Sequence, residues 1–255
     1  MSRDRTRQLT VLVCILVGTA SRLIGDYEGG NSFVPSFTPA TYAFVVWAPI
    51  YLGSLAYAIY QARAASATDP LLRRIGYPSA SAYLLAGTWI RAEDLPVVQL
   101  VLIGTTMAAA AWTFGRLGPV GTAETRAHRF LVRLPIGLFP GWITLATVVA
   151  TSQALSAAGV RPPAELDPGL SVGLVVIAGL IAASVTWRLP YAAAYPATTA
   201  WGLVAAAVHA ASLQPAVAAG VAVAAGVAVM VIVAAGVVRF RSGLGSEAVT
   251  YGWGR

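Results

Sequence analysis

The sequence predicts an all-α protein, a polytopic transmembrane helical bundle of about eight helices. Of the 255 residues, 57% are hydrophobic and only 11% are charged, whereas a soluble domain carries roughly 25% charged residues. So few charges cannot cover the surface of a soluble globule of this size, and a lipid-facing surface needs none. A second observation is the number of long apolar stretches, and a third is the position of the arginines.

Eight apolar stretches are long enough to cross a bilayer as helices. They cover residues 8–25, 40–62, 73–90, 95–116, 130–156, 169–188, 191–212 and 215–238. The third stretch is the least apolar, because Tyr77, Pro78 and Ser79 lie within it. The first follows a basic N-terminus, as in a secretory signal. No clean small-residue cleavage site follows it, so we expect a retained helix.

The arginines fall between these stretches as the positive-inside rule requires. With the N-terminus in the cytoplasm, fourteen arginines lie on the cytoplasmic side and three, Arg22, Arg91 and Arg161, on the outer side. An even number of helices also places the C-terminus in the cytoplasm. Topology and anionic lipid headgroups thus explain the net charge of +7, and we expect no nucleic-acid partner.

Few side chains could carry catalysis or bind a metal. All 17 basic residues are arginine, which excludes a lysine Schiff base. The single cysteine, Cys14, lies in an apolar stretch. His128 and His209 fall at opposite faces of the predicted membrane, which excludes a haem held by both and leaves open a single axial ligand at His209. No acidic residue lies near the middle of a stretch, which argues against proton coupling and against an intramembrane metalloenzyme. We expect no metal site and no catalytic residue, and the pattern favours a non-enzymatic role.

The outer loop at residues 26–38 is the most distinctive connection, with two glycines, a proline and three aromatic residues. This composition is typical of a folded flap, which would cover a pocket between the helices. It is also typical of an aromatic belt at the membrane interface. Arg22 and Asp26 at the start of the loop have the spacing of a local ion pair, and Arg22 is alternatively a site for an anionic group.

Seven tryptophans are the most suggestive set of side chains. Trp89, Trp112 and Trp187 lie near the ends of stretches, as in an interfacial belt. Trp47 and Trp142 lie deeper, and aromatic walls suit flat apolar ligands.

The last stretch consists almost entirely of Ala, Gly, Val and Ile, with Gly220, Ala224 and Gly226 along it. Small residues at this spacing let helices approach closely in lipid. They predict close packing within the bundle, or alternatively a homodimer or membrane-protein partner on the last helix.

The stretch from Phe37 to Gly53 reads FTPATYAFVVWAPIYLG. It resembles the first loop and second helix of the translocator protein, or tryptophan-rich sensory protein, family (TspO/MBR), whose pattern there is F-x-P-P-x-W-x-F-x-x-x-W-x-x-x-Y-x-x-x-G. Trp89 is similar to the tryptophan of the family's third helix, and Pro135 through Thr147 is similar to its fifth helix. The order and spacing of the first five stretches also agree, so the resemblance covers residues 8–156.

The chain departs from this pattern at several positions. Ala40 stands where the family has its second proline, and Ala86 stands where the third helix has an asparagine. The interval from Phe44 to Trp47 is one residue shorter, and three additional stretches follow the first five. The chain is therefore similar to a long, divergent member of the bacterial type, for which we expect the bacterial inner membrane.

The resemblance implies a five-helix bundle at residues 1–156, followed by three additional helices and a short cytoplasmic tail at residues 157–255. It also implies a pocket under the first loop, with residues 33–39 as its cover, for porphyrin, haem or sterol-like ligands. The ligand-binding positions carried over are Phe37, Pro39, Phe44, Trp47, Tyr51, Trp89 and Trp142.

Three functional hypotheses follow. The leading one is a membrane sensor or carrier that binds a flat hydrophobic ligand in an aromatic pocket. The alternative is a non-catalytic assembly subunit, packed on a larger membrane complex through its last helix. A third is an enzyme that degrades porphyrin.

Overall fold

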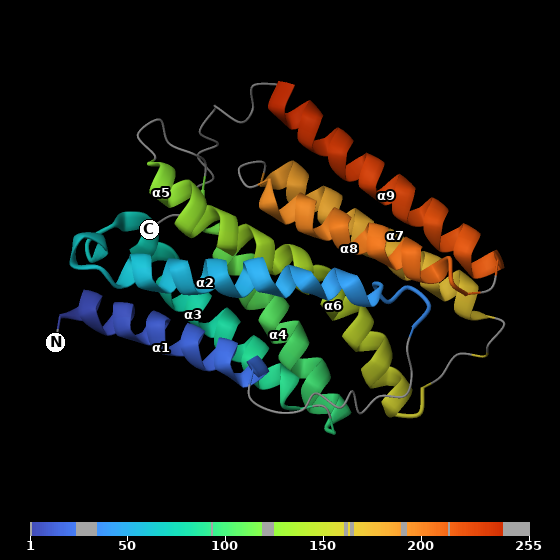
Figure 1. Cartoon of the computed structure of the whole chain (residues 1–255), viewed down its shortest axis with the longest axis horizontal. Coiled ribbons are helices and arrows are strands. Elements are labelled where there is room, and N and C mark those ends of the chain that lie inside the picture. The colour runs from blue at the N-terminus through green and yellow to red at the C-terminus, as the bar shows by residue number, and fades with distance from the viewer. Residues whose placement is uncertain are drawn as a thin grey trace.

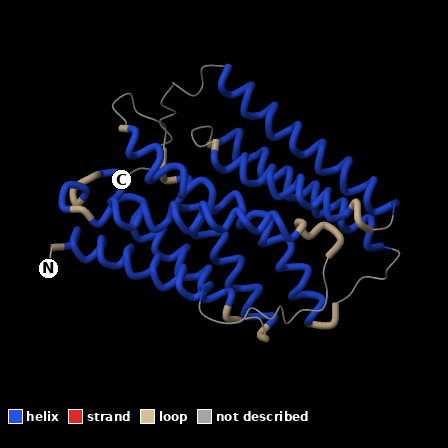
Figure 2. The backbone as a smooth tube through the Cα atoms, viewed as in Figure 1, coloured by secondary structure: helices blue, strands red, loops and turns tan. Residues whose placement is uncertain are grey.

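The computed structural model describes residues 2–23, 35–92, 94–118, 125–160, 163, 166–189, 193–213 and 215–241. The regular structure of these residues is entirely helical (Figure 2). The eight long helices in this part of the chain are α1 (Arg3–Leu23), α2 (Trp47–Ala62), α3 (Pro70–Ile90), α4 (Pro96–Gly115), α6 (Leu134–Ala157), α7 (Asp167–Arg188), α8 (Ala194–Ala210) and α9 (Pro215–Arg241).

Four shorter segments connect or extend these helices. Two are 3-10 helices: η1 (Thr41–Val46), which leads directly into α2, and η2 (Ala64–Ser66), which follows α2. The other two are the one-turn α5 (Arg126–His128) and the π-helical segment η3 (Arg129–Arg133), which lead into α6.

The predicted all-α fold with eight long helices is confirmed, and the helix ends follow local signals. α1 begins before the predicted residue 8, because the Ser2 hydroxyl accepts a hydrogen bond of 3.3 Å from the Arg5 backbone N–H and caps the helix. Asp69 caps the start of α3, because its carboxylate accepts a hydrogen bond from the Leu72 N–H at 3.0 Å. Pro70 is the first residue of the helix. After α4, Gly118 adopts a φ of +67°, the left-handed conformation that commonly ends a helix.

Five continuous helical segments among the described residues are long and apolar enough to cross a membrane. They are Thr41–Ala62, Pro96–Gly115, Arg126–Ala157, Gly169–Arg188 and Val217–Val238. α1 and α3 carry charged residues in their first turns, and α8 has 17 residues. All three pack alongside the five apolar helices in one bundle (Figure 1). The chain is thus an integral membrane protein.

The first five long helices form a closed ring. α1 packs on α3, α3 on α4, α4 on α6, α6 on α2, and α2 returns to α1. Figure 1 shows these helices in blue, cyan, green and, toward the end of α6, yellow. Inside this ring, the hydroxyl of the fully buried Tyr57 of α2 lies 3.0 Å from the Ser79 hydroxyl of α3.

The last three long helices form a second group that packs against α6. α7 and α8 both contact α6, and α9 lies on α7 and α8 (Figure 1). α6 therefore belongs to the ring and also carries the C-terminal group. The division into domains at residues 1–156 and 157–255 falls at the end of α6 and stays a prediction.

Glycines allow three of the helix contacts to be very close. A Cβ atom on Gly18 of α1 would lie 2.2 Å from the Tyr83 carbonyl oxygen of α3. A Cβ atom on Gly141 of α6 would lie 2.5 Å from the Tyr195 carbonyl oxygen of α8. A Cβ atom on Gly179 of α7 would lie 2.4 Å from the Ala228 Cβ of α9. These backbones touch because glycine leaves space that any other residue would fill.

The small residues of α9 pack mainly within the bundle. The position of a Gly220 side chain would lie 2.8 Å from the Val172 methyl group on α7, and Ala224 and Ala228 are buried. Gly226 has open space beside it. The α7 side of α9 is thus occupied within the chain, and a partner on its other side stays a prediction.

Candidate ligand-binding site

The predicted pocket aromatics come together where α2 meets α6. Phe44, Trp47 and Tyr51 follow one another at intervals of three and four residues, which places them on one side of η1 and α2. The Trp47 ring stacks on the Tyr51 ring with centroids 5.1 Å apart. Trp142 of α6 meets Trp47 edge-on at 6.3 Å and Phe44 edge-on at 5.4 Å. We call Phe44, Trp47, Tyr51 and Trp142 the aromatic cluster.

The aromatic cluster runs from the interior to the surface of the bundle. Trp142 is 2% exposed and Trp47 is 7% exposed, so both indoles are buried. Phe44 is 41% exposed although its ring touches Trp142. Because Phe44 has one side free of protein, it is the ring of the cluster with the most room to move.

Phe37 and Pro39 lie just before η1, and both are buried. Phe37 belongs to the hydrophobic core of the bundle. The Thr38 N–H donates to the Pro35 carbonyl at 2.9 Å, so this segment forms a turn above the start of α2. The remainder of the predicted flap, residues 26–34, and the predicted Arg22–Asp26 pair lie outside the described residues or side chains.

Trp89 lies apart from the aromatic cluster. It is half-buried near the end of α3, where it packs against the core. Among the ring contacts of the described residues, none joins Trp89 to the cluster. Among the described residues, its buried indole N–H finds no hydrogen-bond partner. The structure therefore brings four of the seven predicted positions into ring contact. Phe37 and Pro39 precede them in the sequence, and the place of Trp89 in the pocket stays a prediction.

A small void lies between α3, α4 and α6. It has room for about one water molecule and is lined by Ser79, Ala82, Tyr83, Ala110, Thr113, Ile136, Phe139 and Pro140. Tyr83 stacks on Phe139 with ring centroids 4.5 Å apart, and the Tyr57 hydroxyl lies 3.0 Å from the Ser79 hydroxyl nearby. Drug-sized ligands occupy pockets of roughly 300 Å³ or more. This void is therefore too small for a ligand of porphyrin size.

Helix α8 contributes to the site, which motif reasoning did not predict. The Trp201 indole N–H donates to the Ala43 carbonyl at 3.1 Å, and the Ala40 N–H donates to the Ala205 carbonyl at 3.0 Å. Gly202 lies against Trp142, since a Cβ atom there would be 3.4 Å from the Trp142 ring and 2.1 Å from Leu145. The only sequence signal was the presence of Trp201 among the seven tryptophans.

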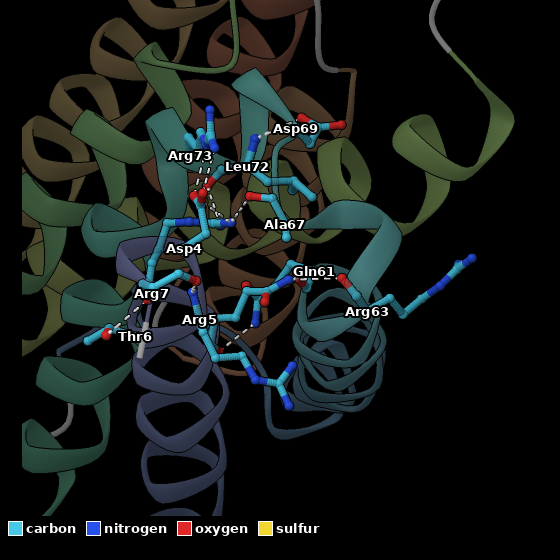
Figure 3. A network of polar contacts seen from close by, with 12 residues as sticks. Asp4, Arg5, Thr6, Arg7, Gln61, Arg63, Ala67, Asp69, Leu72 and Arg73 are labelled. Carbon is cyan, nitrogen blue, oxygen red and sulfur yellow. Dashed lines mark hydrogen bonds and ion pairs between the residues drawn. The ribbon is translucent and has the colours of Figure 1, made fainter.

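At the end of the ring away from the aromatic cluster, arginine and glutamine side chains form hydrogen bonds between the helices (Figure 3). Buried Arg7 donates to the Leu72 carbonyl at 2.9 Å and to the Ala67 carbonyl at 3.0 Å. The Gln8 and Gln61 amides each donate to the other's backbone carbonyl, at 2.7 and 2.9 Å. These bonds tie α1 to the end of α2 and the start of α3.

Asp4 and Arg73 form an ion pair at the surface of this arginine-rich end (Figure 3). The Arg73 Nε donates to the Asp4 carboxylate at 2.8 Å. The hydrogen bonds and the charge of Arg73 hold the pKa of the Asp4 carboxyl below its ordinary value. At the same end, the His128 Nε2 lies 2.9 Å from the Asp69 carboxylate.

The two histidines lie at opposite ends of the bundle. His128 stands in α5 beside Asp69. His209 is in the last turn of α8, one turn beyond Ala205, which pairs with the start of η1. Over the residues that the structure describes, no three His, Cys, Asp or Glu side chains gather into a possible metal site.

A comparison with family models identifies the family of the chain. The model of the family described as TSPO-like protein matches residues 10–236. The chain belongs to the TSPO-like protein family. The TSPO-like match runs through α7, α8 and α9, whereas the motifs read from the sequence covered only the first five stretches. No curated protein and no solved structure matches the chain.

Proposed function

We propose that this TSPO-like membrane protein binds a flat hydrophobic ligand, of the porphyrin or sterol-like class, at the aromatic cluster, and acts as a sensor or carrier. The observation that carries the proposal is the meeting of Trp47 and Trp142, two buried indoles from different helices, beside Phe44 and Tyr51. Four rings at stacking and edge-on distances offer large apolar surfaces with few polar groups, which suits a flat apolar ligand.

The exposure of Phe44 supports a route for the ligand from the lipid. Its ring covers Trp142 and is 41% exposed on its other side. A rotation of Phe44 away from Trp142 would uncover the indole face without changing the helix backbone. Aromatic contacts of this kind contribute about 0.5–1.5 kcal/mol each beyond burial, so a stacked ligand ring can replace them.

The proposal is tested by adding protoporphyrin to the protein purified in detergent and following the quenching of tryptophan fluorescence. Trp47→Ala and Trp142→Ala should each weaken binding by about tenfold or more, because each removes one aromatic wall. Trp112→Ala is the matched control, since Trp112 is 59% exposed on α4 and stacks on Arg116. Equal affinity in the two site variants and the control contradicts the proposal.

A reconstituted system separates a carrier from a sensor. A carrier moves protoporphyrin across vesicles that contain the protein, and Trp142→Ala should slow this movement. A sensor binds with the same affinity without moving the ligand. A light-dependent product formed from bound protoporphyrin would instead favour the degrading enzyme.

The assembly-subunit alternative rests on the outer side of α9. Val223, Met230 and Val233 are exposed there, and they offer apolar surface to lipid or to a partner helix. Purification in a mild detergent distinguishes the two roles. Stoichiometric partner chains favour an assembly subunit, and a lone monomer or dimer that binds protoporphyrin favours the sensor or carrier.

A further inference from the structure

We infer that α8 positions the start of α2, and through it the aromatic cluster, with Trp201 as the main positioning residue. Trp201 and Ala205 stand one helical turn apart on α8, and both bond to the backbone that leads into α2. The inference rests on the proposed function for its consequences on ligand binding. Its structural part, the hold of α8 on residues 40–43, stands on contacts within the chain.

Three contacts make up this hold. The Trp201 indole N–H donates to the Ala43 carbonyl at 3.1 Å, and the indole meets the Tyr42 ring edge-on with centroids 5.6 Å apart. The Ala40 N–H donates to the Ala205 carbonyl at 3.0 Å. Both hydrogen bonds reach backbone groups of the segment itself, so they fix its path and not only one side chain.

The amino acid at position 40 is compatible with a hydrogen bond to α8. The pattern quoted above for the TspO/MBR family has a second proline there, and proline has no N–H to donate. Ala40 keeps the N–H, and that N–H bonds to α8. The departure from the pattern therefore coincides with a contact that only a chain with the additional helices can make.

The contacts of α8 with residues 40–43 lie next to the aromatic cluster. Ala43 immediately precedes Phe44, and the next turn carries Trp47. One residue after Trp201, Gly202 lies against the Trp142 ring. α8 thus contacts Ala43, the residue before Phe44, and also contacts Trp142. A shift of α8 would therefore move the Phe44 and Trp142 rings relative to each other.

Two variants remove the hydrogen bonds separately. Trp201→Phe keeps an aromatic ring but loses the donor to Ala43. Ala40→Pro loses the donor to Ala205 and also sets the proline ring against that carbonyl, while the φ of −55° at this residue suits proline. Trp112→Phe and Ala40→Ser are the matched controls, because the first changes a tryptophan far from the hold and the second keeps the N–H.

Hydrogen exchange of the amides at residues 41–46 and the dissociation rate of protoporphyrin are measured for all four variants. We expect both rates to rise about two- to tenfold in Trp201→Phe and Ala40→Pro, the effect of one lost hydrogen bond, and to stay unchanged in the controls. Unchanged exchange in both variants overturns the inference. Faster exchange with an unchanged dissociation rate also overturns it, because α8 then holds the segment without positioning the site.

The two proposals fail in different ways. If the unaltered protein binds no protoporphyrin, the proposed function fails, and the near-ultraviolet circular dichroism of Ala40→Pro decides the inference. This variant retains all seven tryptophans. A changed tryptophan signal relative to Ala40→Ser supports positioning of Trp47 and Trp142 by α8, and an identical signal overturns it.

Discussion

At the scale of single residues, charge and polarity are concentrated at one end of the helical ring. Arg7 is buried there because two backbone carbonyls accept its N–H groups, which offsets the cost of removing a guanidinium from water. Asp4 and Arg73 pair at the surface of the same end. The interior of the ring instead contains hydroxyl groups that bond to one another, such as Tyr57 and Ser79. Uncharged pairs of this kind suit a membrane interior, where an unpaired polar group is costly.

We expect acid to weaken the attachment of α1 through Asp4. Because the folded-state pKa of Asp4 lies below the ordinary value of 3.8, its ion pair with Arg73 stabilises the fold above that pH, and the contribution is lost as the pH falls through the folded-state pKa. Thermal unfolding in detergent at a series of pH values, compared between Asp4→Asn and the unaltered protein, measures this contribution. The two proteins should differ near neutral pH and converge as the pH falls below the folded-state pKa of Asp4. A constant difference in melting temperature across the series contradicts the assignment to Asp4.

At the scale of elements, close contacts through glycine set the helix positions. Gly18 and Gly87 bring the backbones of α1 and α3 together, and Gly141 does the same for α6 and α8. In lipid, such contacts contribute through van der Waals packing, because burying apolar side chains removes no water.

Gly18→Ala should destabilise the protein by about 1–3 kcal/mol, the usual effect of overpacking. The added methyl group would meet the Tyr83 carbonyl oxygen at 2.2 Å, and a backbone atom cannot move aside without shifting α3. Gly104→Ala on α4 is the control, because nothing lies within 4 Å of its Cβ position. We expect the control to be neutral or slightly stabilising, since alanine favours helix over glycine. Equal unfolding temperatures for the two variants would count against the tight α1–α3 contact.

The elements were predictable to different degrees. Apolar length is a local property, so the eight long helices could be read from the sequence. The depth of Trp47 and Trp142 in their apolar stretches singled them out, and the resemblance added Phe44 and Tyr51. The bonds of Ala40 to Ala205 and of Trp201 to Ala43 could not be predicted, because they use backbone groups that every residue carries. Trp89 was assigned to the pocket by motif position alone; it packs against the core, and its place in the pocket stays a prediction.

At the scale of the whole molecule, the arginine-rich end and the aromatic end lie at opposite ends of the ring. Arg7, Arg74 and Arg133 donate to backbone carbonyls at one end, and the start of α2 meets α8 at the other. The positive-inside rule predicts that the arginine-rich end faces the cytoplasm.

Cysteine labelling in intact cells tests this orientation. In a Cys14→Ser background, Ser32→Cys in the outer loop should react with a membrane-impermeant maleimide added to whole cells. Ala64→Cys, at an exposed position of the arginine-rich end, should react only after the membrane is permeabilised. The reverse pattern of labelling would invert the predicted topology.

The ring closes only through α6, and this sets an order for assembly during synthesis. α1, α3 and α4 can pair with a neighbour as each emerges, but α2 gains its second neighbour only when α6 enters the membrane. The backbone at Ala40 and Ala43 gains its hydrogen bonds later still, because its partners on α8 are made more than 150 residues later in the chain. A ribosome that stopped between α4 and α8 would thus release a chain in which α2 had been inserted but not fixed.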